Sequence, residues 1–560
     1  MRIALAQQNY HIGNFTDNTR KIIEGIEWAK SQQADLVMFS ELCVCGYPPR
    51  DFLEFDDFIR QCYAAVDAIR EHADTIGVLI GGPDRNPVRE GKDLFNAAFF
   101  LYEKEVKAVV HKTCLPNYDV FDEYRYFEPA YHWQVIPFKG KRLAVTICED
   151  IWNLGDNPLY RNCPMDELMK QSPDLMLNIS ASPFDYTHVE DRKAIVKRNT
   201  AKYQLPMLYC NGVGSQTEIV FDGGSLVADK YSNLIKQLPL FEEAYDVFDL
   251  RDDGSFEQPV LVEAGELPNE EFNPTALDEN LCTAEIYRAI SSGIRDYFRT
   301  MGFTKAILGS SGGIDSAVTL AIACEALGAE NVRAVLMPSQ YSTDHSVADA
   351  EQLSRNLGNQ YDIVPIQNIY ESFLQELQPI FGDLPFGLAE ENIQARTRGN
   401  LLMAIANKFG YILLNTSNKS ELATGYGTLY GDMAGGLAVL GDCYKMQVYA
   451  LARYINREKE IIPEHILIKP PSAELRPGQK DADSLPDYAI LDKLLYQYIE
   501  KRQGPAEIKS QGFDAALVDR VLRMVNMNEY KRNQFCPIIR ISPKAFGVGR
   551  RVPIVGKYLS

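Results

Sequence analysis

Histidine is scarce in this sequence, with only 7 residues among 560. The 11 cysteines are scattered and odd in number, and no two of them form a Cys-x-x-Cys pair. Zinc sites and disulfide frameworks depend on closely spaced cysteine or histidine residues. The sequence therefore argues against both, and any catalytic site must work with little imidazole.

Positive charge is also in short supply. Lys and Arg number 57 against 76 Asp and Glu, which gives a formal net charge of -19. This excess repels phosphate backbones and anionic lipids, so we expect neither nucleic acid nor a membrane as a partner. No apolar run is long enough to span a bilayer, and residues 1–7 lack a signal-peptide pattern. We expect a cytoplasmic protein that acts on small molecules.

The rest of the composition is that of a globular protein, with 46% apolar and 24% charged residues. Residues 1–250 alternate β-branched runs with amphipathic segments, which predicts a first α/β domain. Residues 251–280 hold Pro259, Pro268 and Pro274 without sustained periodicity, so we expect a linker there. Residues 281–560 form the predicted second domain.

The second domain begins with apolar runs that alternate with helical patterns. This order predicts a doubly wound parallel sheet that binds ligands at the carboxyl ends of its strands. The expected strands are residues 306–308, 332–337, 361–365 and 411–414, and the expected helices are residues 317–327, 345–357 and 390–409.

A loop rich in glycine and serine follows the first of these strands and opens a helix. Its residues are Gly309, Ser310, Ser311, Gly312, Gly313, Ile314, Asp315 and Ser316. Backbone N–H groups in such a loop, together with a helix N-terminus, present donors to phosphate oxygens. The loop lacks the Gly-Lys-Ser/Thr ending of a Walker A motif, which argues against a GTPase or motor ATPase.

The Ser-Gly-Gly-x-Asp-Ser pattern resembles that of the N-type ATP pyrophosphatases, which activate a carbonyl or carboxylate as an adenylate. The segment from about residue 281 to 551 further resembles the NAD synthetase family. This resemblance rests on the motifs at residues 391–398, 415–421, 471–477 and 529–532.

The NAD synthetase resemblance implies a set of ligands for the second domain. By position, Thr416 contacts ATP, Asn392, Glu421 and Lys531 contact deamido-NAD, and Asp315 and Glu421 bind Mg²⁺. Carboxylates are hard oxygen ligands that suit magnesium, and lysine suits anionic groups. Arg396 follows Asn392 by one helical turn and is either a further substrate contact or a surface ion-pair residue.

Cys148 follows the apolar run 142–147 and is the candidate nucleophile of the first domain. A reactive cysteine needs a base or a positive neighbour to form the thiolate. Motifs around Glu41, Lys112 and Cys148 resemble those of the carbon-nitrogen hydrolase (nitrilase) family, in the same order. The resemblance implies that Glu41 accepts a proton, Lys112 stabilises the oxyanion and Cys148 forms a thioester.

The glutamine-using branch of that family places its substrate against residues that correspond to Tyr118, Ser182 and His188. Members of the branch usually carry lysine at the third position. His188 therefore departs from the pattern, and it adds a group that titrates near neutrality.

Together the resemblances imply an α-β-β-α amidase domain joined to an ATP pyrophosphatase domain. The expected reaction is amidation of deamido-NAD through an adenylate, with ATP as co-substrate, Mg²⁺ as cofactor and glutamine as ammonia donor. The same resemblance implies a homo-oligomer. One alternative is an amidotransferase for another adenylated acceptor, as in GMP and asparagine synthetases. Another is an amidase whose second half only senses nucleotide.

Overall fold

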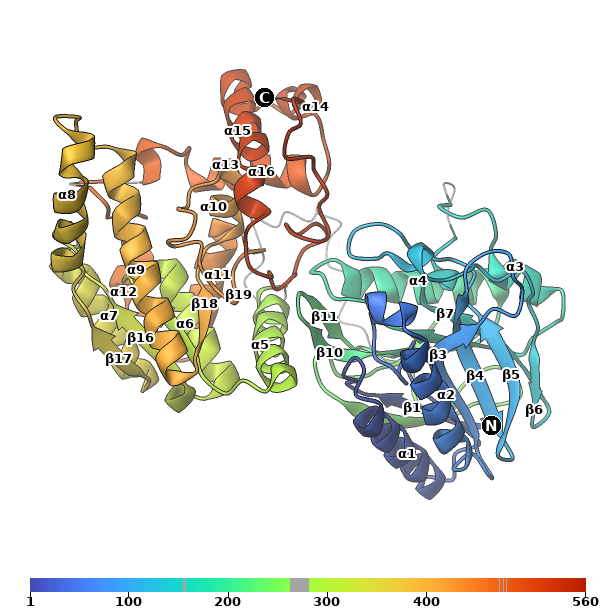
Figure 1. Cartoon of the computed structure of the whole chain (residues 1–560). Coiled ribbons are helices and arrows are strands. Elements are labelled where there is room, and N and C mark those ends of the chain that lie inside the picture. The colour runs from blue at the N-terminus through green and yellow to red at the C-terminus, as the bar shows by residue number, and fades with distance from the viewer. Residues whose placement is uncertain (155–157, 262–281, 473, 477, 480, 560) are drawn as a thin grey trace. The chain divides into compact units, whose positions relative to one another are not determined.

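The computed structural model of the chain describes residues 1–154, 158–261, 282–472, 474–476, 478–479 and 481–559. The chain divides into two compact units, Met1–Glu270 and Glu271–Ser560 (Figure 1). Most of the expected linker 251–280 lies outside the described residues. Its first part, residues 251–261, packs on the first unit, where Phe256 is buried in the core. Within the described ranges, no helix is long and apolar enough to cross a bilayer.

The first unit contains two six-stranded sheets, each with a mixed strand order. One sheet runs β14-β1-β2-β3-β4-β5 and the other runs β13-β12-β9-β8-β7-β6. The strands of the first sheet are β1 (Arg2–Gln7), β2 (Leu36–Met38), β3 (Gly77–Arg85), β4 (Leu94–Tyr102), β5 (Glu105–His111) and β14 (Ala244–Asp249). Those of the second are β6 (Ile136–Phe138), β7 (Lys141–Ile147), β8 (Leu175–Ser180), β9 (Met207–Asn211), β12 (Leu226–Ala228) and β13 (Leu234–Gln237).

Alternation along the strands makes this unit four layers thick. In β1, Ile3 and Leu5 join a core with Leu143 and Val145 of β7, between the two sheets. Ala4 and Ala6 point the other way, toward α1 (Phe15–Ser31) and α2 (Asp56–Arg70). In the second sheet, outward side chains pack against α3 (Pro164–Met169) and α4 (His188–Tyr203). Because successive strand residues face opposite sides, helix, sheet, sheet and helix stack in that order.

The second unit is built on a five-stranded sheet of order β17-β16-β15-β18-β19. All of its neighbouring strands are parallel. They are β15 (Ala306–Gly309), β16 (Val332–Leu336), β17 (Gln360–Ile363), β18 (Ile412–Asn415) and β19 (Leu437–Ala438). The chain leaves β15 toward β16 and later returns to β18 on the other side of β15. This reversal of strand order creates a crevice at the carboxyl ends of β15 and β18.

Helices cover the sheet of the second unit on both faces. One face carries α6 (Ile314–Leu327), which contacts α5 (Cys282–Met301) and α11 (Lys445–Ile455), and α7 (Asp344–Leu357) contacts β16 and β17. The other face carries α9 (Leu388–Phe409), which contacts β15 and β18, with α8 (Gln367–Phe381) beside it (Figure 1). A further group of helices packs around its own apolar core: α10 (Lys419–Thr424), α13 (Tyr488–Ile499), α14 (Pro505–Ser510) and α15 (Ala515–Met527). Two short helices complete the unit, α12 (Glu464–Ile468) and α16 (Glu529–Arg532).

The fold class predicted from the sequence is confirmed in both units. The first is an α-β-β-α sandwich and the second a doubly wound parallel sheet. The helices expected at 317–327, 345–357 and 390–409 are α6, α7 and α9, each of which begins one to three residues earlier.

Candidate active sites

In the first unit, Glu41 lies just beyond the end of β2, in a turn that passes close to β3. Gly81 makes this approach possible, because a Cβ at that position would lie only 2.3 Å from the backbone nitrogen of Leu42. The turn buries Glu41 and fixes both of its carboxylate oxygens. Oε2 accepts a hydrogen bond from the Ala181 backbone N–H at 3.0 Å, and Oε1 accepts one from Asn96 Nδ2 at 2.7 Å.

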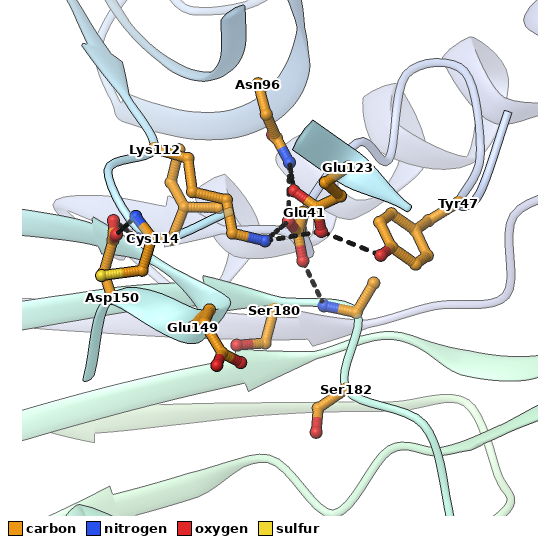
Figure 2. A network of polar contacts seen from close by, with 12 residues as sticks. Glu41, Tyr47, Asn96, Lys112, Cys114, Glu123, Glu149, Asp150, Ser180 and Ser182 are labelled. Atoms are coloured by element: carbon orange, nitrogen blue, oxygen red, sulfur yellow. Dashed lines mark hydrogen bonds and ion pairs between the residues drawn. The ribbon is translucent and has the colours of Figure 1, made fainter. Parts of the chain in front are cut away.

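Lys112 follows β5 and is completely buried between two carboxylates (Figure 2). Its Nζ donates to Glu41 Oε1 at 2.7 Å and to Glu123 Oε1 at 2.8 Å. Burial acts to lower the pKa of Lys112, but the charges of Glu123 and Glu41 outweigh it and raise that pKa well above its usual value. Lys112 is therefore a permanent cation at the centre of the site.

Glu123 completes the cluster, and the sequence did not reveal it. It lies in the short 3-10 helix η2 (Glu123–Arg125), where it accepts hydrogen bonds from Tyr47 Oη at 2.9 Å and from Asn96 Nδ2 at 3.2 Å. Burial, with the nearby charge of Glu41, raises the pKa of Glu123 to about 7, although Lys112 opposes the rise. Glu41 and Glu123 together hold the lysine ammonium from two sides.

Cys148 stands at the end of β7, where the chain turns into the 3-10 helix η3 (Cys148–Ile151) with a left-handed φ of 43°. Asp150 fixes this turn: its Oδ2 accepts from the Ile147 backbone N–H at 3.0 Å, and its Oδ1 accepts from the backbone N–H groups of Thr113 and Cys114 at 3.0 and 2.8 Å. Asp150 thus ties the candidate nucleophile to the segment that carries Lys112.

The Cys148 thiol is held in its neutral form at rest. Burial raises the pKa of Cys148 well above its usual value and the Glu41 carboxylate raises it further, while the Lys112 charge lowers it. Formation of the thiolate therefore requires a base beside the thiol, and Glu41 is the carboxylate with the strongest effect on Cys148.

The residues predicted to bind glutamine lie on segments that follow β5 and β8. Ser182 Oγ and His188 Nε2 are 2.9 Å apart, and the His188 ring stacks on Trp152 at 4.9 Å between centroids. Tyr118 Oη donates to the two carboxylate oxygens of Glu149, the residue after Cys148, at 2.9 and 3.0 Å. Tyr118 is therefore joined to the residue that follows the candidate nucleophile.

The second unit holds a cavity of about 540 Å³ at the carboxyl ends of β15 and β18. The Gly309–Ser316 loop forms one wall, and every residue predicted to bind ATP or deamido-NAD lines this cavity. Gly312 shows why the loop needs glycine. Its φ is +75°, and a Cβ there would lie 2.2 Å from the backbone oxygen of Ser346.

Three of the predicted ligands reach the cavity from other elements. Thr416 follows β18, while Asn392 on α9 accepts a hydrogen bond from Thr428 Oγ1 at 2.7 Å. Lys531 on α16 donates to the backbone oxygens of Gly425 and Gly427 at 2.7 and 2.8 Å. The fold thus brings together residues from widely separated parts of the sequence.

Asp315 and Glu421, the predicted magnesium ligands, share a lysine that the sequence did not reveal. Lys445 Nζ lies 2.5 Å from Asp315 Oδ2 and 3.6 Å from Glu421 Oε1. Burial and the Asp315 charge raise the pKa of Glu421 to about 8, against the opposing effect of Lys445. Two carboxylates that repel each other beside the predicted phosphate-binding loop are a donor set that fits Mg²⁺.

Magnesium at this position also needs oxygen ligands from outside the protein. Among the described residues, no group of three or more His, Cys, Asp or Glu is arranged to hold a metal ion. Magnesium usually binds through one or two carboxylates together with substrate phosphates and water. Asp315 and Glu421 fit that pattern.

Comparison with known proteins agrees with the two-unit architecture. A carbon-nitrogen hydrolase family model matches residues 2–251, and an NAD synthase family model matches residues 286–535. A glutamine-dependent NAD(+) synthetase from Synechocystis is 44% identical over 559 residues, which cover 99% of this chain and 98% of that one. The chain belongs to the glutamine-dependent NAD(+) synthetase family. A second member, from Thermotoga maritima, is 42% identical over 100% of this chain and 99% of its own.

Solved structures of this synthetase family share the architecture. The enzyme from Acinetobacter baumannii, solved in complex with adenosine diphosphate, is 39% identical and superposes with a TM-score of 0.77. The superposition covers 99% of this chain and 98% of the other. These full-length matches are to NAD(+) synthetases. They count against the two alternatives, a GMP or asparagine synthetase and an amidase whose second half only senses nucleotide.

Glu123 and Lys445 are the two charged residues that sequence reasoning missed. The sequence around Glu123 gives little indication of a role, because most glutamates are exposed to solvent and nothing nearby marks this one as buried. Lys445 lies 130 residues from Asp315, so only the fold reveals the pairing.

Proposed function

We propose that this chain amidates deamido-NAD to NAD, with ATP as co-substrate and ammonia drawn from glutamine hydrolysed at Cys148. The products are NAD, AMP, diphosphate and glutamate, and the reaction completes NAD biosynthesis. The main support is that one chain carries a complete Glu-Lys-Cys cluster and, separately, a phosphate-binding cavity.

The amidase half of the proposal assigns one role to each residue. Glu41 takes the proton from the Cys148 thiol as sulfur attacks the amide carbon of glutamine. Lys112 stabilises the developing oxyanion, and the proton passes to the departing ammonia. Water then cleaves the thioester to glutamate. Tyr118, Ser182 and His188 hold the glutamine, with Glu123 keeping Lys112 in place.

The ligase half begins with the phosphates of ATP against the Gly309–Ser316 loop and Thr416. Deamido-NAD is held by Asn392, Glu421 and Lys531. Its carboxylate attacks the α-phosphorus of ATP, and diphosphate leaves. Ammonia then attacks the adenylated carboxyl carbon and displaces AMP. Asp315 and Glu421 would hold Mg²⁺, which neutralises phosphate charge when it is bound. Ammonia is largely protonated near neutral pH and ammonium is not a nucleophile, so a shielded supply favours the second step.

Three further properties belong to the proposal. We infer a resident Mg²⁺ requirement, cytoplasmic location and a homo-oligomer. The cysteines of the described residues that can be assessed are free thiols, which suits a reducing compartment. Two apolar side chains, Ile380 in α8 and Leu384 just beyond it, are 77% and 75% exposed. Exposed apolar side chains of this kind suit contact with a second copy of the chain. The molecular mass from light scattering tests whether the protein is an oligomer.

Two reciprocal variants test the two-site proposal. Cys148→Ala should abolish NAD formation from glutamine while synthesis from added ammonia continues at near the wild-type rate. Asp315→Ala should abolish NAD formation from either donor while basal glutamine hydrolysis persists. Loss of both activities in Cys148→Ala, or unchanged NAD synthesis in Asp315→Ala, would contradict the assignment.

A further inference from the structure

Arg398 is a cation in the wall of the nucleotide cavity that lacks a carboxylate partner. It lies on α9, is half-buried, and lines the cavity. Its Nε donates to the backbone oxygen of Met337 at 3.0 Å. Within the described ranges of the chain, no carboxylate oxygen lies within ion-pair distance of its guanidinium.

Two other cations in the lining of the cavity have carboxylate partners. Lys445 pairs with Asp315 at 2.5 Å, and Lys469 pairs with Glu474 at 2.8 Å. Burial lowers the pKa of Arg398 to about 10, although the more distant charges of Asp432 and Glu474 act to raise it. An arginine withdrawn from water without a counter-ion costs folding free energy, so its retention calls for an anion that binds later.

The position of Arg398 indicates which anion this is. Met337, which accepts its hydrogen bond, lies beside the start of the phosphate-binding loop, since a Cβ on Gly309 would lie 3.3 Å from Met337 Cε. Gly309 in turn opens the loop that lines this side of the cavity. A guanidinium has planar, forked donors that match phosphate oxygens.

We propose that Arg398 is a ligand for a nucleotide phosphate group, which supplies the counter-ion missing from the free protein. This inference rests on the proposed function, in which both ATP and deamido-NAD carry phosphates into the cavity. It adds a direct substrate contact to the loop, Thr416 and Lys531.

The test measures the affinity of the full-length protein for three probes, each alone with magnesium: α,β-methylene-ATP, deamido-NAD and adenosine. Arg398→Met should raise the Kd for at least one of the two phosphate-bearing probes by about 10- to 100-fold, the effect of losing a charge-assisted contact. Adenosine affinity should stay unchanged. Arg398→Lys keeps the charge and should recover part of the affinity. The phosphate-bearing probe whose Kd rises identifies the nucleotide that Arg398 contacts.

A matched control separates this role from a structural one. Arg333 on β16 is also partly buried, but its Nε pairs with Asp362 at 2.6 Å. Arg333→Met should lower the melting temperature and leave every Kd unchanged. Arg398→Met should not lower the melting temperature, because the wild-type guanidinium has no counter-ion to lose.

Three results would overturn the inference. These are an unchanged Kd for both nucleotides, an equal loss of adenosine affinity, and misfolding or a fall in melting temperature like that of Arg333→Met. If the wild-type protein itself binds neither nucleotide, the proposed function fails as well. Wild-type binding with an unchanged Arg398→Met variant refutes only the role of Arg398.

Discussion

At the scale of single residues, the amidase site is a balance of buried charges. Lys112 forms ion pairs with both Glu41 and Glu123, and none of the three residues is more than 5% exposed to solvent. One cation cannot fully compensate two buried anions, so one carboxylate must accept a raised pKa. The pKa of Glu123 rises to about 7, chiefly through burial. Glu41 is the base that we propose for the Cys148 thiol.

This balance predicts how stability depends on pH. Because the pKa of Glu123 is about 7 in the folded state against an ordinary value of 4.5, the native protein retains a proton that the unfolded chain has released. Stability from this group is present below pH about 4.5 and is lost as pH rises to about 7. Gln at position 123 cannot titrate. Between these pH values the free energy of unfolding should therefore fall less in Glu123→Gln than in the wild type, by on the order of 1–3 kcal/mol.

Thermal melts between pH 5 and about 8 measure the effect, since that window covers most of the titration. Glutaminase activity of Glu123→Gln should fall by about 10- to 100-fold, because Lys112 loses one of the two groups that position it. The exposed Glu243, which forms an ion pair with Lys21, offers the control: Glu243→Gln should alter neither property. A steeper pH dependence in Glu123→Gln than in the wild type would refute this description of the charge balance.

At the scale of elements, strand ends and helix starts position both sites. Cys148 and Glu41 follow the buried strands β7 and β2, and the predicted phosphate-binding loop joins β15 to α6. Buried hydrogen bonds join such elements to one another. Asp492 on α13, for example, accepts from Ser420 Oγ at 2.5 Å and from the Met446 backbone N–H at 2.9 Å. It thereby holds the starts of α10 and α11, which carry Glu421 and Lys445.

A comparison of two glycines in the second unit distinguishes backbone strain from steric conflict. Gly312 and Gly358 both have left-handed φ values, +75° and +77°, but a Cβ on Gly358 would meet nothing within 4 Å. Gly358→Ala should therefore cost about 1 kcal/mol of strain and leave nucleotide affinity unchanged. Gly312→Ala should cost more, because the loop must also move away from Ser346, and should weaken ATP binding at least tenfold.

Titration calorimetry with α,β-methylene-ATP and chemical denaturation of both variants provide the comparison. Glutaminase activity should survive in each, because both glycines lie in the second unit. Equal ATP affinities in the two variants would show that the close approach of Gly312 to Ser346 is not required for binding.

The periodic elements could be predicted from the sequence, and the convergence of side chains could not. Helices α6, α7 and α9 are long enough to show a helical repeat, and the apolar runs mark β1, β7 and β15. Strand β12, with only three residues, is too short to show a period. Glu41, Lys112 and Cys148 were found through motifs, whereas Glu123 and Lys445 are defined only by the charges they meet in three dimensions.

At the scale of the whole molecule, two kinds of chemistry share one chain. We assign ammonia release to the buried cluster of Glu41, Lys112 and Cys148 in the first unit, and nucleotide binding to the cavity at the switch point of the parallel sheet in the second. We propose that glutamine binds in the first unit and that ATP and deamido-NAD bind in the second. The joint consequence of these assignments is that the amide nitrogen of glutamine becomes the amide nitrogen of NAD.

Transfer of an isotopic label tests that consequence most directly. The full-length protein is incubated with ATP, magnesium, deamido-NAD and glutamine labelled with ¹⁵N at the amide, and all products are identified by mass. We expect NAD that carries the ¹⁵N label, AMP and diphosphate in amounts equal to the NAD, and at least as much glutamate. Cys148→Ala should form no NAD from glutamine. Formation of ADP and phosphate in place of AMP and diphosphate, or NAD without the label, would contradict the account.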